Sequence, residues 1–475
     1  MDTTLRALNR FGLGARIGER RRVSDPKAWL RAQLEGAPPA IAPPAAGSPA
    51  ALGEAIRAFR SPARNTPEQR QQLRRRLIEV ASQESQAALT LRVTSDRPFV
   101  ERLVAFWSNH LCVSTAAKVL VAPLAGSYER EAIRPHVLGR FEDMVLASAR
   151  HPAMLVYLDN FQSIGPNSRG ARRGRGRRGL NENYARELLE LHTLGVNGGY
   201  TQQDVQELAK ILTGWTVGGL QNVGAGLRGV GSLRDPTSQD WLDGPLLRTV
   251  PARQAEIGFA FQDALHEPGA RTVLGARYGE AGVAQGEHVI RDLCRHPSTA
   301  QFIATKLAAH FVADDPPAAA VERIARVFRT TGGDLRAVAA ALIDVQEAWT
   351  DTARKFRTPQ DWLVAVLRAV NAPAVNAMTL PVLRQLRHPL WAPQAPKGFG
   401  DTVQEWADPD SLLNRAELAR TFARRMRDAR LDGAALLDVV DVGAGDPLRA
   451  LVADTSIAAG DRVALAIAGP AFQWR

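Results

Sequence analysis

The segment from residue 181 to residue 192 carries the densest set of side chains that could do chemistry. It places Glu182, Asn183, Arg186 and Glu187 beside leucines, on what the spacing predicts to be an amphipathic helix. Carboxylates can accept protons or bind divalent metals, and a guanidinium can hold an anion through paired hydrogen bonds. The same i, i+4 spacing is also typical of ion pairs on an exposed helix face, which stabilise a helix by only about 0.2–0.5 kcal/mol each.

Histidines at remote positions are the other side chains able to move protons near neutral pH or to bind metals. His110 lies on the flank of a helix expected within residues 96–115, whose apolar side chains recur at helical spacing. His266 belongs to a predicted turn, and His310 lies four residues after Lys306 on another helix with an apolar face. The competing interpretation of His110 is a half-buried side chain hydrogen-bonded to a carbonyl group.

An enzyme hypothesis assigns roles to these residues. Without a metal, His110 or Glu187 is the general base and Arg186 anchors an anion. With a divalent metal as cofactor, the bound water is the nucleophile. The candidate metal ligands, which share imidazole or carboxylate donors, are His110, Glu182, His266 and His310. Because the sequence contains no HExxH, GxSxG or glycine-rich phosphate loop, these side chains would have to converge from remote segments.

Helical periodicity accounts for most of the segments that must position these residues. Alternation typical of strands is sparse, so we expect a predominantly α fold with long irregular loops. Local signals also mark helix starts. The tripeptide Arg-His-Pro at 150–152 and at 295–297 predicts a histidine at or near the N-cap, since proline suits the first turn. Thr201 and Asp204 form a predicted capping box.

Three segments have the composition of irregular structure. They are an Ala/Pro-rich linker at 36–51, an Arg/Gly-rich mobile loop at 165–179 and a Gly-rich insertion at 214–257. The loop at 165–179 holds six arginines, without which the formal net charge of +11 would be +5. A solvated basic loop explains this charge. No helix-turn-helix, zinc finger or aromatic-interleaved basic strand accompanies it, so a nucleic-acid partner is not expected.

The remaining composition bears on the compartment. No apolar run approaches about eighteen residues, which predicts no transmembrane helix. Cys112 and Cys294 are too few for a disulfide framework, which is compatible with a reducing compartment. Met1 leads directly into a stretch of mixed polarity without the apolar core of a secretory signal. We therefore expect a soluble protein of the cytoplasm.

A set of motifs runs through nearly the whole chain in one order. They are LNRFGLG at 8–14, FWSNH at 106–110, HPAML at 151–155, the block at 181–215, HEPG at 266–269, the segment 296–310, FRTP at 356–359 and PKG at 396–398. Through these motifs the chain resembles the bacterial domain-of-unknown-function family 1800. This resemblance implies one domain over residues 1–475. It also favours a polar site at Asn109-His110 and at 181–187, which includes Asn183.

The resemblance implies a partner more clearly than a reaction, because the family has no assigned activity. Its members are often encoded beside a protein of domain-of-unknown-function family 1501, which is alkaline-phosphatase-like and often exported. One alternative to an enzyme is therefore a scaffold or maturation partner that presents residues 390–406 and 214–257. Co-export to the periplasm with such a partner is the alternative to a cytoplasmic location. The family usually has His-Asp-x-Gly where this chain has His-Glu-Pro-Gly at 266–269, so that Glu267 replaces the aspartate. At the position of His192 the family often has Phe.

Overall fold

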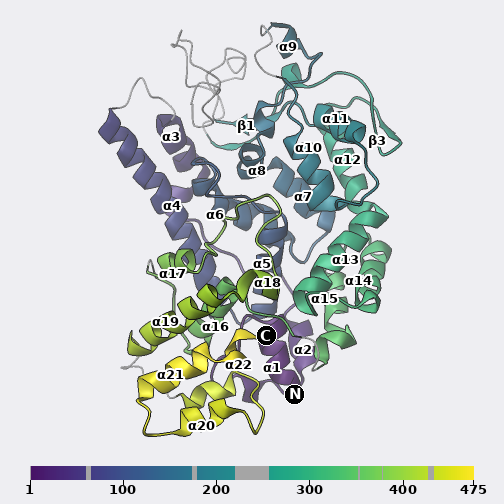
Figure 1. Ribbon diagram of the computed structural model, residues 1–475. Helices are drawn as coiled ribbons and strands as arrows, with labels where there is room; N and C mark the ends of the chain where they lie inside the picture. The colour runs from purple at the N-terminus through teal and green to yellow at the C-terminus, as the bar shows by residue number, and fades with distance from the viewer. Residues whose placement is uncertain are drawn as a thin grey trace.

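The computed structural model describes residues 2–59, 66–173, 179–219, 256–350, 354–376, 378–425 and 433–475. Helices dominate these residues, and the predicted predominantly α fold is confirmed. Figure 1 shows the markers of the first and last residues close together in the lower part of the molecule. Contacts agree with this view, since Arg10 Nη2 donates to the Arg475 carbonyl over 2.9 Å.

The first part of the chain is built from helices of four to 28 residues. They are α1 (Thr3–Arg6), α2 (Pro26–Ala32), α3 (Pro49–Phe59), α4 (Pro67–Thr94), α5 (Pro98–His110), α6 (Ala125–Tyr128), α7 (Phe141–Arg150), α8 (Pro152–Tyr157), α9 (Arg169–Arg173), α10 (Asn183–Glu187) and α11 (Gln202–Ile211). Single π-helical segments continue α1, α6 and α10. They are η1 (Ala7–Phe11), η6 (Glu129–Ile133) and η9 (Leu188–Thr193).

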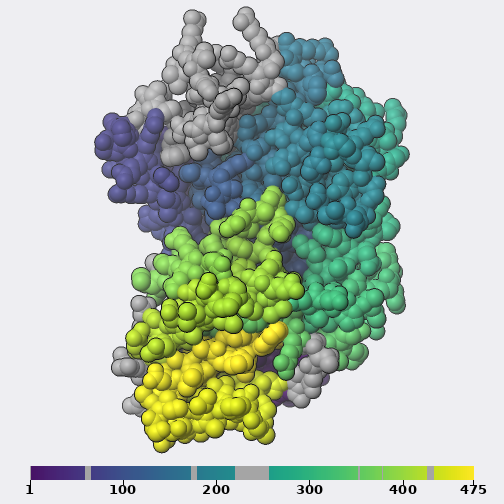
Figure 2. Space-filling view, viewed as in Figure 1, coloured from purple at the N-terminus to yellow at the C-terminus, as the bar shows by residue number. Residues whose placement is uncertain are grey.

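The second part of the chain is also helical. Its helices are α12 (Val283–Arg295), α13 (Pro297–Phe311), α14 (Ala318–Thr330), α15 (Leu335–Ile343), α16 (Pro359–Ala369), α17 (Thr379–Gln385), α18 (Val403–Trp406), α19 (Pro409–Arg425), α20 (Pro447–Ala453), α21 (Ala459–Ala468) and α22 (Pro470–Gln473). Helices α13, α14 and α15 lie side by side along one flank, and α19 packs on α21. Figure 2 shows the yellow-green and yellow C-terminal segments covering the lower left of the face in view.

The strands of the described residues form two small antiparallel hairpins. In one, β1 (Trp215–Gly218) pairs with β2 (Gly258–Phe261), and in the other, β3 (Arg271–Val273) pairs with β4 (Ala276–Tyr278). The first hairpin joins the two ends of the predicted Gly-rich insertion, of which residues 220–255 lie outside the described residues. The structure thus adds a short paired stem where the sequence predicted only irregular chain.

The local signals for helix starts are confirmed. His151 caps α8, since its Nδ1 accepts a hydrogen bond from the Ala153 amide, and His296 caps α13 in the same way. The capping box of Thr201 and Asp204 opens α11 as predicted. These caps satisfy backbone donors at the first turn that no helical carbonyl can reach.

The other two segments predicted to be irregular contain short helical stretches within their described residues. Within residues 36–51 the structure places a short 3-10 turn, Ala45–Gly47, and the start of α3 at Pro49. Within residues 165–179, α9 occupies Arg169–Arg173, and residues 174–178 lie outside the described residues. No helix in the described part of the chain combines the length and apolarity that a membrane span requires.

Helices α5 and α13 carry the side chains that matter most for a site, and both are fixed by an apolar face. In α5, Val100, Leu103, Val104 and Trp107 are buried at helical spacing, as predicted. Burial of one such side chain contributes roughly 1.5–3 kcal/mol. The remaining polar side chains of both helices are therefore held at fixed positions on the flanks of a packed core.

Candidate functional site

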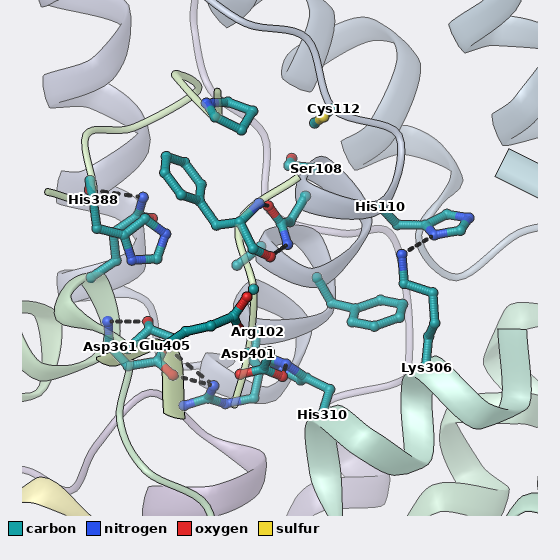
Figure 3. A pocket seen from close by; sticks show the side chains of 18 of the residues that line it. Arg102, Ser108, His110, Cys112, Lys306, His310, Asp361, His388, Asp401 and Glu405 are labelled. Atoms are coloured by element: carbon teal, nitrogen blue, oxygen red, sulfur yellow. Dashed lines mark hydrogen bonds and ion pairs between the residues drawn. The ribbon is translucent and has the colours of Figure 1, made fainter. Parts of the chain in front are cut away.

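A cavity of about 380 Å³ lies between α5, α13, α16 and an irregular stretch that we call the wall segment, residues 388–402. Figure 3 shows the polar side chains that surround it. Its ionisable or otherwise polar lining residues are Arg92, Arg102, Ser108, Asn109, His110, Cys112, Lys306, His310, Asp314, Lys355, Thr358, Gln360, Asp361, His388, Lys397, Asp401, Thr402 and Glu405. Its volume lies within the range of small-molecule sites, roughly 300–1,000 Å³.

The wall segment supplies the partner of His310. Asp401 Oδ2 lies 2.5 Å from His310 Nδ1, so the carboxylate accepts the Nδ1 proton and fixes the ring. The other ring nitrogen, Nε2, is buried and has no hydrogen-bond partner within the described residues. Burial lowers the pKa of His310 to about 4, although Asp401 acts in the opposite direction. The imidazole is therefore neutral near pH 7, with a free lone pair on Nε2.

Asp401 is itself held in the ionised form. Burial alone would raise its pKa, but His310, Lys355 and Arg475 outweigh that effect and lower the pKa to about 2. Lys355 donates to the Asp401 carbonyl and also pairs with Asp314. The lysine thus fixes both the main chain and the charge environment of Asp401.

His110 has both ring nitrogens engaged. Lys306 Nζ lies 3.0 Å from His110 Nδ1, and His110 Nε2 lies 3.1 Å from the His192 carbonyl. An ammonium can only donate and a carbonyl can only accept, so Nδ1 is the acceptor and Nε2 carries the proton. Burial, with repulsion from Lys306, holds the pKa of His110 well below its usual value. His110 is thus a neutral positioning residue for Lys306.

The wall segment is anchored to α5 through main-chain atoms. Asn109 donates from Nδ2 to the Phe399 carbonyl over 2.8 Å and accepts from the Phe399 amide over 2.8 Å. Gly398 makes this approach possible, since its φ is +82° and an added Cβ would lie 2.4 Å from the Asn109 carbonyl oxygen. The Asn109 side-chain amide therefore pairs with both main-chain groups of Phe399 and holds the wall segment against α5.

Two further side chains after α5 reach main-chain carbonyls of the wall segment. Cys112 donates to the Pro396 carbonyl over 3.1 Å, and Ser114 donates to the Pro393 carbonyl over 2.6 Å. Burial raises the pKa of the Cys112 thiol to about 12, so it remains a protonated donor. The cysteine is therefore a structural anchor and not a thiolate nucleophile.

A buried carboxylate ties three sides of the cavity together. Glu129 Oε2 accepts hydrogen bonds from Arg92 over 2.8 Å, Ser108 over 2.9 Å and Trp391 over 3.0 Å. Its second oxygen pairs with Arg134 at 3.1 Å. Burial favours the neutral acid, but the two arginines outweigh it and lower the pKa of Glu129. This charge network fixes α4, α5 and the wall segment relative to each other.

A second ion-pair group forms the floor beside α16. Asp361 lies 3.1 Å from Arg102 and 3.2 Å from Arg475. Burial opposes ionisation, yet these arginines and His310 hold the pKa of Asp361 well below its usual range. Arg102 also donates to the Gly12 carbonyl over 2.7 Å. The Asp361 amide also donates to Thr358 Oγ1 over 3.2 Å, so the motifs at 8–14 and 356–359 both contact this ion-pair group.

The structure separates the predicted site residues into two groups. His110, His310 and Asn109 line the cavity, whereas the predicted polar residues of 181–187 are not among its lining residues. Arg186 pairs with Glu182 at 3.3 Å on the surface of α10 and donates to Gln202 over 2.7 Å. Asn183 is exposed and donates to the Leu158 carbonyl over 3.3 Å. Glu187 is partly buried, and burial raises its pKa.

His266 belongs to another part of the molecule. Its Nδ1 lies 2.9 Å from the Thr213 carbonyl, and its ring packs on Phe261 of β2. The adjacent Glu267 is buried and accepts from the Asn167 amide over 2.7 Å, which fixes the loop before α9. The four predicted metal ligands are therefore not brought together. Among the described residues no group of three or more His, Cys, Asp or Glu side chains could hold a metal ion.

Sequence reasoning missed several of the residues that give the cavity its charge. They are Arg102, Lys355, Asp361, His388 and Asp401. One signal did point to the site, because Lys306 and His310 are i, i+4 neighbours beside an apolar face. The sequence marks residues 390–406 only as a candidate partner surface, and nothing in it indicates that Asp401 reaches α13.

Comparison with known proteins identifies the family. The chain matches the family model described as "Protein of unknown function (DUF1800)" over residues 6–474, and it belongs to this family. The resemblance inferred from the motifs is therefore confirmed. No curated protein and no solved structure matches the chain. The family description names no activity.

Proposed function

We propose that this family member is an enzyme and that the cavity lined by α5, α13, α16 and the wall segment is its active site. The proposal assigns His310 as the general base, with Asp401 as the residue that positions it. One observation carries it: His310 Nε2 is buried, faces no hydrogen-bond partner among the described residues, and belongs to a ring that a carboxylate fixes from the other side.

The chemistry of this pair supports proton transfer. A buried polar atom without a partner costs about 1–3 kcal/mol of stability, and a catalytic role is one of the reasons such an atom is retained. Asp401 keeps the Nε2 lone pair free by holding the proton on Nδ1, and it stabilises the imidazolium that forms after proton abstraction. The base then returns the proton to a leaving group or to water.

The metal alternative has less support than acid–base chemistry. His110 uses both ring nitrogens, and one of them faces the Lys306 ammonium, which repels a cation. The scaffold alternative explains the anchors of the wall segment but leaves His310 Nε2 without a role. A partner of family 1501 is compatible with either function.

A substrate screen with matched variants tests the proposal. Wild-type protein and His310→Ala are assayed against p-nitrophenyl esters of acetate, butyrate and phosphate and against bis-p-nitrophenyl phosphate. We expect turnover of at least one substrate, with a loss of about 10²-fold or more in His310→Ala. His288→Ala, which changes an exposed histidine of α12, should retain full activity. Equal rates in wild type and His310→Ala for every substrate would contradict the proposal.

A further inference from the structure

Lys306 is an unusual cation among those that line the cavity. Three of the others have a carboxylate partner within the described residues: Arg92 pairs with Glu129, Arg102 with Asp361, and Lys355 with Asp314. Each of these carboxylates comes from a different segment of the chain than its cation. Lys306, by contrast, has no ion pair in the part of the chain that the structure describes, and its hydrogen-bond partner is the neutral His110.

The geometry around Lys306 leaves hydrogen-bonding capacity unused. An ammonium has three N–H donors, and His110 Nδ1 can accept only one of them. Phe302 lies beside the same group, with its ring centroid 5.6 Å from Nζ, and can supply only a weak cation–π contact. Because His110 Nε2 donates its proton to the His192 carbonyl, the neutral ring offers Lys306 one acceptor, Nδ1, and no negative charge.

A charge in such a place is costly to the folded protein. Moving an ammonium out of water without a counter-ion is strongly unfavourable, and natural buried charges are normally paired. Burial accordingly lowers the pKa of Lys306 to about 8, which still leaves most of the side chain charged at pH 7. An anion bound beside Nζ would remove this imbalance.

We propose that Lys306 is the anion-binding residue of the cavity, and that the substrate is a small molecule carrying an oxyanion, either a carboxylate or a phosphate. This proposal rests on the proposed function of the cavity and names its substrate class. Lys397, an exposed lysine at the same cavity with no ion pair among the described residues, adds positive charge on the path of an incoming anion.

The position of Lys306 relative to His310 makes the proposal specific. The two residues are four positions apart on α13, so their side chains leave the same face of the helix roughly 6 Å apart along its axis. Figure 3 shows both projecting from this helix towards the cavity. One small molecule can therefore place its anionic group at Lys306 and present a proton to His310.

Nuclear magnetic resonance of isotope-labelled lysine side chains tests the inference directly. The chain contains six lysines, at positions 27, 118, 210, 306, 355 and 397, so the spectrum is simple to assign by substitution. Inorganic phosphate and acetate are titrated separately, with chloride adjusted to keep the ionic strength constant. We expect the Lys306 signal to move saturably with at least one anion, and the pKa of Lys306 to rise in its presence. If phosphate binds more tightly than acetate, the substrate class is a phosphate, and if acetate binds more tightly, it is a carboxylate.

Variants separate this site from general surface charge. Lys306→Gln should weaken binding by about tenfold or more, as expected for one charge-assisted hydrogen bond, while Lys306→Arg keeps it within a few-fold. Lys118→Gln is the matched control, because Lys118 pairs with Asp159 outside the cavity. If Lys306→Gln does not fold, the wild-type titration and Lys306→Arg still decide. No saturable shift in wild type, or equal binding by Lys306→Gln, would overturn the inference.

The base and the anion site can fail independently. His310→Gln is expected to abolish turnover but to bind phosphate or acetate like wild type. If wild type shows His310-dependent turnover but no saturable anion binding, the role of Lys306 is rejected and that of His310 stands. If wild type binds the anion at Lys306 but shows no His310-dependent turnover, the role of His310 as general base is rejected and that of Lys306 stands.

Discussion

His310 and Asp401 form a hydrogen-bonded pair of 2.5 Å although 91 residues separate them in the chain. One belongs to a helix and the other to the irregular wall segment, and each is further fixed by packing or by an ion pair. The pair resembles in its chemistry the histidine–carboxylate arrangement of many enzymes, in which the carboxylate selects one tautomer of the base.

The activity should have a bell-shaped dependence on pH. His310 accepts a proton only when neutral, that is above its pKa of about 4, and Lys306 holds an anion only when charged, below its pKa of about 8. Hence kcat/KM for a substrate from the screen should rise through about pH 4 and fall through about pH 8. In Lys306→Arg the alkaline limb should move to higher pH. A flat profile from pH 5 to 9, roughly, would contradict this assignment.

Asp401→Asn should impair catalysis more than binding. The substitution removes the charge that stabilises the imidazolium and lets His310 turn to the wrong tautomer, so kcat should fall by about 10²-fold or more with little change in KM. Asp454→Asn, at an exposed carboxylate, is the control. Nitrogen-15 spectra of the histidines should show the His310 tautomer change, and an unchanged tautomer would argue against a positioning role.

Asn109→Ala should loosen the wall segment. Both hydrogen bonds to Phe399 are lost, which costs roughly 1–3 kcal/mol and leaves the main chain of Phe399 unpaired. Amide hydrogen exchange at residues 397–401 should become faster, while exchange in α14 stays slow. Asn183→Ala removes an exposed amide with one long hydrogen bond. It should change the exchange rates neither at residues 397–401 nor in α14. Equal protection in both variants would show that the wall does not depend on Asn109.

Glu129→Gln should be strongly destabilising. The change leaves Arg92 buried beside a neutral partner, whereas Arg134 keeps its ion pair with Glu101. Breaking a buried ion pair such as that of Arg92 costs about 3–5 kcal/mol. Glu322→Gln removes an exposed pair with Arg329 and should cost less than about 1 kcal/mol. Urea unfolding of the two variants measures the difference. A loss below about 1 kcal/mol for Glu129→Gln would contradict the network.

Arg186→Ala should have little effect. Its partners Glu182 and Gln202 lie on the surface of the molecule, where such contacts contribute about 0.2–1 kcal/mol. Thermal unfolding and the substrate screen should both resemble wild type. A selective loss of activity at unchanged stability would restore the segment 181–187 as a site.

The features predicted correctly from the sequence depend on nearby residues. His151, His296 and Thr201 act on amides two or three positions away, so their caps are visible in a short window. The helix face of α5 follows in the same way from periodicity. The amphipathic flanks of α5 and α13 were enough to place His110 and His310 among the candidates.

The rest of the site depends on contacts between remote segments. Asp401 reaches His310, and Asp361 reaches Arg102, only because remote helices and the wall segment pack together. No periodic pattern in the sequence predicts such a contact. The segment 181–187 shows the opposite difficulty. Its i, i+4 charges fit a surface ion pair and a polar site equally well, and only burial and partners distinguish the two.

The way the wall segment is held has an evolutionary consequence. Asn109, Cys112 and Ser114 bind main-chain atoms of residues 393–399, so the identity of most side chains along that stretch does not enter the anchoring. Mutations there can change the lining of the cavity while its frame persists. Selection can thus alter the lining of the cavity one residue at a time without passing through an unfolded intermediate.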